Sequence, residues 1–218
     1  MKTLRKELPL LLLSLLPPFY LLVVWNRIPQ NVAMHYDLHG NVDRYGSKSE
    51  LVWLSVLLPL LCYFLLMALP SIDPKRKIEG MGNKFWQLRF ILGIFITGLM
   101  VFVVYSSQYS VSMKPNIVIG GIGLLFTALG NYFKTIRPNY FLGIRTPWTL
   151  ESDVVWKETH RVAGILWFFG GLLVAVFSVI LSNPELLFYI FIIIMVFLVV
   201  IPFAYSYTKF RQVKSKML

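Results

Sequence analysis

Residues 185–207 read ELLFYIFIIIMVFLVVIPFAYSY and carry one charged side chain, Glu185, at the very start. An apolar run of about 20 residues can cross the hydrocarbon core of a bilayer, about 30 Å thick, as an α-helix. Five more apolar stretches bounded by charged residues lie at 8–26, 51–70, 88–106, 117–133 and 162–182. We therefore predict an all-α integral membrane protein with six transmembrane helices.

The composition of the chain agrees with this prediction. Of the 218 residues, 57% are hydrophobic and only 14% are charged, whereas soluble domains carry about 25% charged residues. Six spans of about 20 residues use more than half of the chain, so little is left for a water-exposed domain. The single cysteine, Cys62, lies within an apolar run, which excludes a disulfide framework and a thiolate metal cluster. We expect no cofactor.

The net charge of +11 is explained by the orientation of the chain in the membrane. Lysine and arginine number three in the N-terminal tail, five in the second loop, five in the fourth loop and four in the C-terminal tail, which places 17 of 21 on one side. By the positive-inside rule, both termini are predicted to be cytoplasmic and the odd-numbered loops external. Direct contact with nucleic acid is disfavoured, and contact of the basic tail with anionic lipid is a secondary role.

The predicted spans lack the side chains that chemistry inside a membrane requires. No ionisable residue lies near the middle of a span, since Arg89 and Glu185 lie at span ends. Motifs of zinc proteases, intramembrane aspartate proteases, P-loop proteins and serine hydrolases are missing from the sequence. We therefore predict that the protein is not an enzyme.

The fourth predicted span is the most polar and is rich in glycine. Gly123, Thr127 and Asn131 fall on one helical face, with Gly120 and Gly130 close by. The simplest interpretation is a seam at which a neighbouring helix approaches closely. The alternative is a ligand groove that uses the Asn131 amide, which would suit a small-molecule or lipid transporter or flippase without ion coupling.

The first loop, residues 27–50, is long and is predicted to be ordered. On an extended strand His35, Asp37 and His39 would share one face and could hold a metal ion if Asp43 folded back. The simpler interpretation is a compact loop with glycine turns and solvated charges. In either case, we expect an extracellular ligand to contact this loop. Its candidate binding residues are His35, Asp37, His39, Gly40, Asp43 and Lys48.

The fourth loop, residues 134–161, changes along its length from a turn-forming to a helical pattern. Ser152 is a suitable helix N-cap and Asp153 suits the first helical turn, so we predict a helix that continues into the fifth span. On composition alone, the loop would supply an aromatic belt at the headgroups and anchors to lipid phosphates. The residues concerned are Trp148 and Trp156 for the belt, and Arg145 and Arg161 for the anchors.

The same loop contains a motif that resembles the signature of the SdpI family of bacterial membrane proteins. The motif comprises Gly130-Asn131, RPNYF at 137–141, GIRTPWTL at 143–150, Val155-Trp156 and Thr159-His160-Arg161. The first loop resembles a domain of unknown function that often precedes this signature. The residues that match it are Ile28-Pro29, His35, Gly40 and DRYGSK at 43–48.

The resemblance implies a multi-pass protein of the bacterial plasma membrane that gives immunity to a secreted toxic peptide. In one member of this family, the toxin-engaged protein also holds a cytoplasmic transcriptional repressor at the membrane. We expect an N-terminal two-helix unit at 1–85 and a four-helix unit at 86–218. The signature residues expected to bind partners or to respond are Asn131, Asn139, Gly143, Arg145, Thr146, Pro147, Trp148, Thr149, Trp156 and His160.

Overall fold

The computed structural model describes residues 2–74, 76–109 and 114–216. Lys75, one of the basic residues used to predict the orientation, lies outside them. Six of the described helices are long and apolar enough to cross a membrane. They are α1 (Lys2–Val23), α2 (Lys48–Ile72), α3 (Asn83–Tyr109), α4 (Pro115–Phe133), α6 (Asp153–Ile180) and α7 (Pro184–Ser215). The predicted class, an all-α protein with six transmembrane helices, is confirmed.

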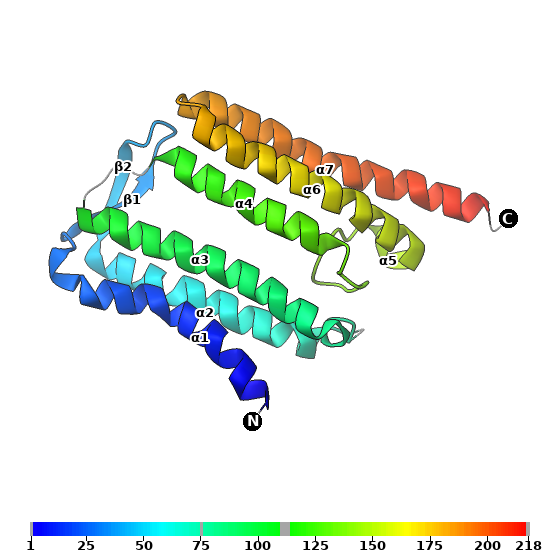
Figure 1. The fold of residues 1–218 in the computed structure, drawn as a ribbon, viewed down its shortest axis with the longest axis horizontal. Helices are drawn as coiled ribbons and strands as arrows, with labels where there is room; N and C mark the ends of the chain where they lie inside the picture. Colours follow the sequence, from blue (N-terminus) through cyan, green and yellow to red (C-terminus); the bar gives the residue numbers. More distant parts are fainter. Residues whose placement is uncertain (1, 75, 110–113, 217–218) are drawn as a thin grey trace. The chain divides into compact units, whose positions relative to one another are not determined.

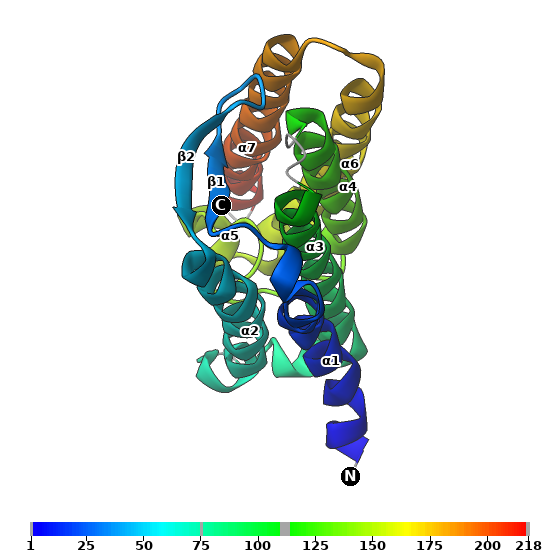
Figure 2. The same cartoon turned by 90° about the vertical axis from the view of Figure 1, so that its left-hand side faces the viewer.

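The chain folds as two compact units that alternate along the sequence. The first comprises Met1–Met67 and Arg89–Val118, and the second Ala68–Leu88 and Ile119–Leu218. Within the first unit α1, α2 and α3 run alongside one another, and within the second unit α4, α6 and α7 do so (Figures 1 and 2). The division of the sequence at residue 85 stays a prediction. Packing crosses that point, since the Thr97 hydroxyl of α3 donates to Leu13 O of α1 at 3.0 Å.

In the first unit, the loop between α1 and α2 forms a β-hairpin, which the all-α prediction did not include. Strands β1 (Asn31–Tyr36) and β2 (Val42–Ser47) pair antiparallel, and the 3₁₀ turn η1 (Trp25–Arg27) precedes them. The turn between the strands passes through Gly40, which has a φ of 85° that favours glycine. Val32 is fully buried in an apolar cluster with residues of α1, α2 and α3. The hairpin is thereby held against the ends of the three helices.

In the second unit, α4 and α6 are in contact through glycines. A Cβ added to Gly123 would lie 2.7 Å from the carbonyl oxygen of Gly171, and one added to Gly164 would lie 2.8 Å from that of Gly130. These distances leave no room for a side chain, so the two backbones touch. The packing seam predicted for the fourth span is confirmed.

The second and fourth loops lie at the same end of this unit. The second loop contains the 3₁₀ turn η2 (Glu79–Met81). The Tyr132 hydroxyl, near the end of α4, donates to Lys84 O at 2.7 Å. Because successive spans cross the membrane in opposite directions, the second and fourth loops must lie on the same side. Which side of the membrane this is stays a prediction.

Candidate functional site

The fourth loop, here called the signature loop (residues 134–161), begins with a turn built around Asn139. This side chain is fully buried. Its Oδ1 accepts hydrogen bonds from the backbone N–H groups of Phe141 and Leu142, at 2.8 and 2.7 Å. Its Nδ2 donates to the carbonyl oxygens of Arg137 and Leu142, at 2.7 and 3.3 Å. Asn139 therefore satisfies four backbone groups and shapes the turn, which leaves its amide no capacity for a ligand.

His160 connects the middle of the loop to α6. Its Nε2 accepts the backbone N–H of Ile144 at 3.0 Å, and its Nδ1 lies 2.8 Å from Trp156 O. Gly143, with a φ of 91°, lets the chain pass directly over the ring, because a Cβ at this position would collide with Nε2. Gly143 thus leaves room for the His160 ring, and the two ring nitrogens of His160 bond the loop to α6.

The two tryptophans of the loop are packing residues. The Trp156 side chain, only 2% exposed, stacks on the His160 ring with centroids 4.1 Å apart, and its Nε1 donates to Ile136 O at 2.9 Å. Trp148 packs against Phe203 and Tyr207 of α7, with centroids 5.4 and 4.9 Å apart. For Trp156 the headgroup-belt interpretation is wrong, because the side chain is buried inside the protein and its indole N–H is bonded to a loop carbonyl.

The short helix α5 (Pro147–Glu151) begins with a capping box formed by Thr146 and Thr149. The Thr146 hydroxyl accepts the Thr149 N–H at 3.2 Å, and the Thr149 hydroxyl accepts the Thr146 N–H at 2.9 Å. Pro147 fits as the first residue because that position needs no N–H donor. The Thr146 hydroxyl also donates to Ser206 of α7 at 3.1 Å, which ties the loop to that helix. The predicted N-cap at Ser152 is confirmed by the bond from Val155 N.

Arg145 is the exposed charge at the centre of this assembly. One of its terminal nitrogens donates to Tyr140 O at 2.6 Å, which fixes the guanidinium without neutralising it. Its remaining N–H donors suit a carboxylate or phosphate, for which the planar fork of arginine is matched. Arg137 and Lys157 are also exposed in the same loop. The loop is therefore a folded cap whose interior is aromatic and hydroxylic and whose surface exposes these three basic side chains together with Glu151 and Asp153.

Nine of the ten predicted signature residues contribute to this cap. Asn131 does not, because it lies on the exposed side of α4, on a groove that it shares with Lys134 and Arg161. Sequence reasoning missed the partners outside the motif, namely Ser206, Phe203 and Tyr207 of α7. They lie about 60 residues downstream in an otherwise apolar span, and no local pattern connects them to the loop.

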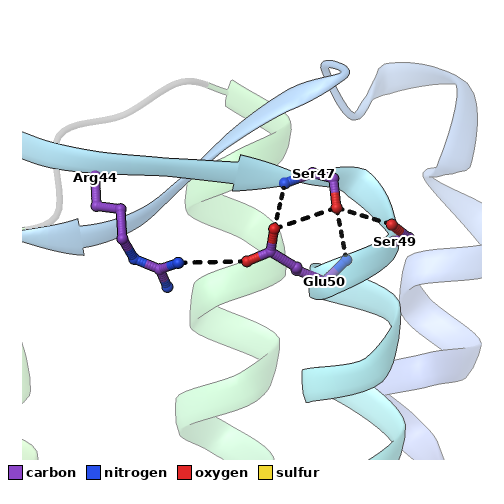
Figure 3. A network of polar contacts seen from close by, with 4 residues as sticks. All are labelled: Arg44, Ser47, Ser49 and Glu50. Carbon is purple, nitrogen blue, oxygen red and sulfur yellow. Dashed lines mark hydrogen bonds and ion pairs between the residues drawn. The ribbon is translucent and has the colours of Figure 1, made fainter.

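The hairpin of the first unit is joined to α2 by a network of polar contacts (Figure 3). Glu50 accepts the Ser47 N–H at 3.0 Å and lies 3.4 Å from the guanidinium of Arg44. The Lys48 ammonium donates to Trp25 O at 2.6 Å and lies 3.9 Å from the centroid of the Trp25 ring. These contacts fix how β2 runs into α2. Lys48, a predicted binding residue, is thereby engaged inside the unit.

The polar residues of the hairpin form two separate groups. His35 Nδ1 lies 2.6 Å from the carboxylate of Asp43. Asp37 lies beyond the end of β1, where its carboxylate accepts the backbone N–H groups of His39 and Asn41. Burial alone raises the pKa of Asp37, but the hydrogen bonds from Asn41 and His39 outweigh it, so the pKa lies below its ordinary value.

This arrangement does not bring the predicted metal ligands together. The strand ends at Tyr36, so His35, Asp37 and His39 do not share one extended face. Across residues 2–74, 76–109 and 114–216, no three histidine, cysteine, aspartate or glutamate side chains form a group that could hold a metal ion. The hairpin instead borders a cavity of about 350 Å³, lined by residues that include Tyr36, Tyr45, Asn41 and Ser106.

The first unit also contains an ion pair that the sequence analysis did not predict. Two nitrogens of Arg89, at 2.7 and 2.6 Å, donate to the two carboxylate oxygens of Glu7. The Arg89 side chain is only 7% exposed, and the Tyr63 hydroxyl donates to the same carboxylate at 3.2 Å. The pair links α1, α2 and α3. The sequence feature that could have indicated this pair is Glu7, the one acidic residue in the basic N-terminal tail.

Comparison with known proteins gives matches to both parts of the chain. Residues 135–206 match the SdpI/YfhL protein family, and residues 12–60 match a domain of unknown function (DUF1648). The chain is 23% identical over 193 residues to the immunity protein SdpI of Bacillus subtilis (strain 168), which covers 86% of this chain and 88% of that protein. No solved structure matches the chain. The family resemblance of the two loops is confirmed, and with its six apolar helices the chain is a bacterial multi-pass membrane protein.

Proposed function

We propose that this chain, whose residues 135–206 match the SdpI/YfhL protein family, is a membrane immunity protein that protects its bacterium from a secreted toxic peptide. The observation that carries the proposal is the similarity to an immunity protein over most of both chains, combined with a signature loop in which nine motif residues form one assembly. The function requires binding and a response, and it includes no catalytic step.

The hairpin is the proposed contact for the peptide. Its cavity has both polar and apolar walls, with two tyrosines that suit the side chains of an amphipathic or apolar peptide. The hairpin is held by Val32 in the apolar cluster and by the Glu50 network (Figure 3), so a ligand would meet a preformed surface. Preformed surfaces lose less entropy on binding.

The signature loop is the proposed site of the response. Its exposed arginines and lysine would dock an acidic segment of a cytoplasmic repressor. The loop is tied to α7 through Thr146 and Trp148, so a shift of α7 against α6 would change the loop. A toxin that favours one of two packings by a few kcal/mol would then alter repressor binding.

The experiment compares survival of cells exposed to a co-encoded secreted peptide. A strain that lacks the gene is expected to be more sensitive than its parent, and expression of the chain restores resistance. Arg145→Ala and Trp148→Ala are expected to lose resistance while their membrane levels stay normal. Arg211→Ala, which removes an exposed cation of α7 outside the signature loop, serves as the matched control and keeps resistance. Equal sensitivity of the deletion strain and its parent to every co-encoded peptide contradicts the proposal.

The repressor step is tested separately by co-purification. Wild-type protein solubilised from toxin-treated cells is expected to retain a cytoplasmic DNA-binding protein, and Arg145→Ala is expected to release it. Immunity without any such retention leaves the resistance proposal standing and removes the signalling part.

The groove beside Asn131 favours a second candidate, a small-molecule or lipid transporter or flippase. This function predicts substrate-dependent flux in proteoliposomes that Asn131→Leu abolishes. Immunity in the absence of such flux would contradict this second candidate function.

A further inference from the structure

The groove between α4 and α6 exists because two helices touch through glycine. At Gly130 and Gly164 the backbones are in contact, and these two buried glycines line the groove. The result is a groove of about 350 Å³ on the outside of the second unit. Its walls are apolar, with Ile165 and Phe169 exposed by 55% and 58%. Asn131, Lys134 and Arg161 lie at one end.

The polar end of the groove lies at the depth expected for lipid headgroups. α4 ends at Phe133 after 19 residues, so Lys134 follows directly on a helix about 28 Å long. From Arg161 to the end of α6 at Ile180, the helix also measures about 28 Å. Both lengths equal roughly one hydrocarbon thickness. The two cations therefore sit at the same boundary, with the glycine floor and the aromatic wall on its apolar side.

The charges at this end have no counter-charge in the described part of the protein. Neither the Lys134 nor the Arg161 side chain forms an ion pair or hydrogen bond with a described residue. Both are exposed, as is the Asn131 amide. Two cations and an amide donor above an apolar groove complement an anionic headgroup above an acyl chain.

We propose that this groove binds one anionic phospholipid. The headgroup phosphate would accept hydrogen bonds from Arg161, Lys134 and Asn131, and one acyl chain would lie over Gly130 and Gly164 against Phe168 and Phe169. The bound lipid would cover apolar surface that the two helices leave open. The groove differs from the cap in place, because it lies over α4 and α6, although Lys134 and Arg161 are the first and last residues of the signature loop.

The test is native mass spectrometry of the full chain in detergent, titrated with phosphatidylglycerol or with phosphatidylcholine of the same acyl chains. Each basic residue near a membrane surface favours anionic lipid by about fivefold. Wild-type protein is therefore expected to bind the first phosphatidylglycerol at least about tenfold more tightly than phosphatidylcholine. The double variant Lys134→Gln with Arg161→Gln is expected to lose this preference.

Matched controls separate the site from general charge and from soluble phosphate. Arg211→Gln with Lys214→Gln removes the same charge from the exposed end of α7 and keeps the preference. Ile165→Trp fills the groove and weakens binding of phosphatidylglycerol although both cations remain. Glycerol phosphate does not displace the lipid. The proposal is overturned if wild type shows no preference, if both double variants lose it equally, or if glycerol phosphate competes as well as the lipid does.

Discussion

His160 joins two parts of the second unit through its ring nitrogens. The Ile144 N–H donates to Nε2, so Nε2 carries no proton and Nδ1 donates to Trp156 O. Protonation of Nε2 would set two donors against each other in a buried site. Its role is therefore to position the signature loop. This role explains why the motif contains both Gly143 and His160, which lie 17 residues apart in the sequence but are in contact in the structure.

Gly143→Ala is expected to destabilise the protein and loosen the loop. A non-glycine residue at a φ of 91° costs about 1–3 kcal/mol, and the added Cβ also displaces the His160 ring. Thermal unfolding in detergent, followed by tryptophan fluorescence, measures the loss.

Substitutions at two other glycines distinguish the cost of a positive φ from the cost of the collision with His160. Gly82→Ala places a side chain at a residue that already has a positive φ, 52°, with nothing within 4 Å of the added Cβ, so it should cost less than Gly143→Ala. Gly98→Ala, in open space within α3, should leave stability unchanged or slightly improved. Equal effects at Gly143 and Gly82 would show that contact with His160 is unimportant.

Asn139→Ala is expected to open the start of the signature loop. It removes the partner of partly buried backbone groups, and each group left unsatisfied costs up to about 1–3 kcal/mol. The readout is limited proteolysis, in which trypsin should cleave after Arg145 much faster than in wild type. Asn131→Ala, at an exposed asparagine of α4, is the matched control and should not change the cleavage rate. Similar cleavage of both variants contradicts the role given to Asn139.

The helices were predictable because each is an apolar run with charged ends, and hydrophobicity is a local property. The N-cap at Ser152 and the glycine seam of α4 were predictable for the same reason. The hairpin was not predicted, since its strands mix polar and apolar residues on both faces and its register contains irregularities. Its stability depends on Val32 reaching a cluster that includes Val104, a contact that no local pattern reveals.

The Glu7–Arg89 pair links α1 to α3 and should dominate the stability of the first unit. Arg89→Met is expected to cost about 1.5–3 kcal/mol, the range for hydrogen bonds to a charged group, because the partly exposed Glu7 carboxylate then keeps only the Tyr63 hydroxyl as a donor. Adding Glu7→Gln should recover part of this loss. Denaturant unfolding of both single variants and the double variant measures the coupling. Additive effects of the two substitutions would mean that the pair contributes no net interaction.

The site could be predicted from sequence only in part. The motif identified which residues belong together, and nine of them do meet in the cap. It did not separate buried residues such as Trp156 from exposed ones such as Arg145, because burial depends on where α7 packs. The distribution of basic residues predicted an orientation in the membrane. That Lys134 and Arg161 line the same groove between α4 and α6 could be seen only in the fold.

A protein that connects an external peptide to a cytoplasmic partner must present the hairpin and the signature loop on opposite sides of the membrane. Single-cysteine variants His39→Cys and Arg145→Cys, made in a Cys62→Ser background, test this with a membrane-impermeant maleimide. Position 39 is predicted to be labelled in intact cells, and position 145 only in inside-out vesicles. Labelling of position 145 in intact cells, or of both positions from the same side, would contradict six crossings with a cytoplasmic signature loop.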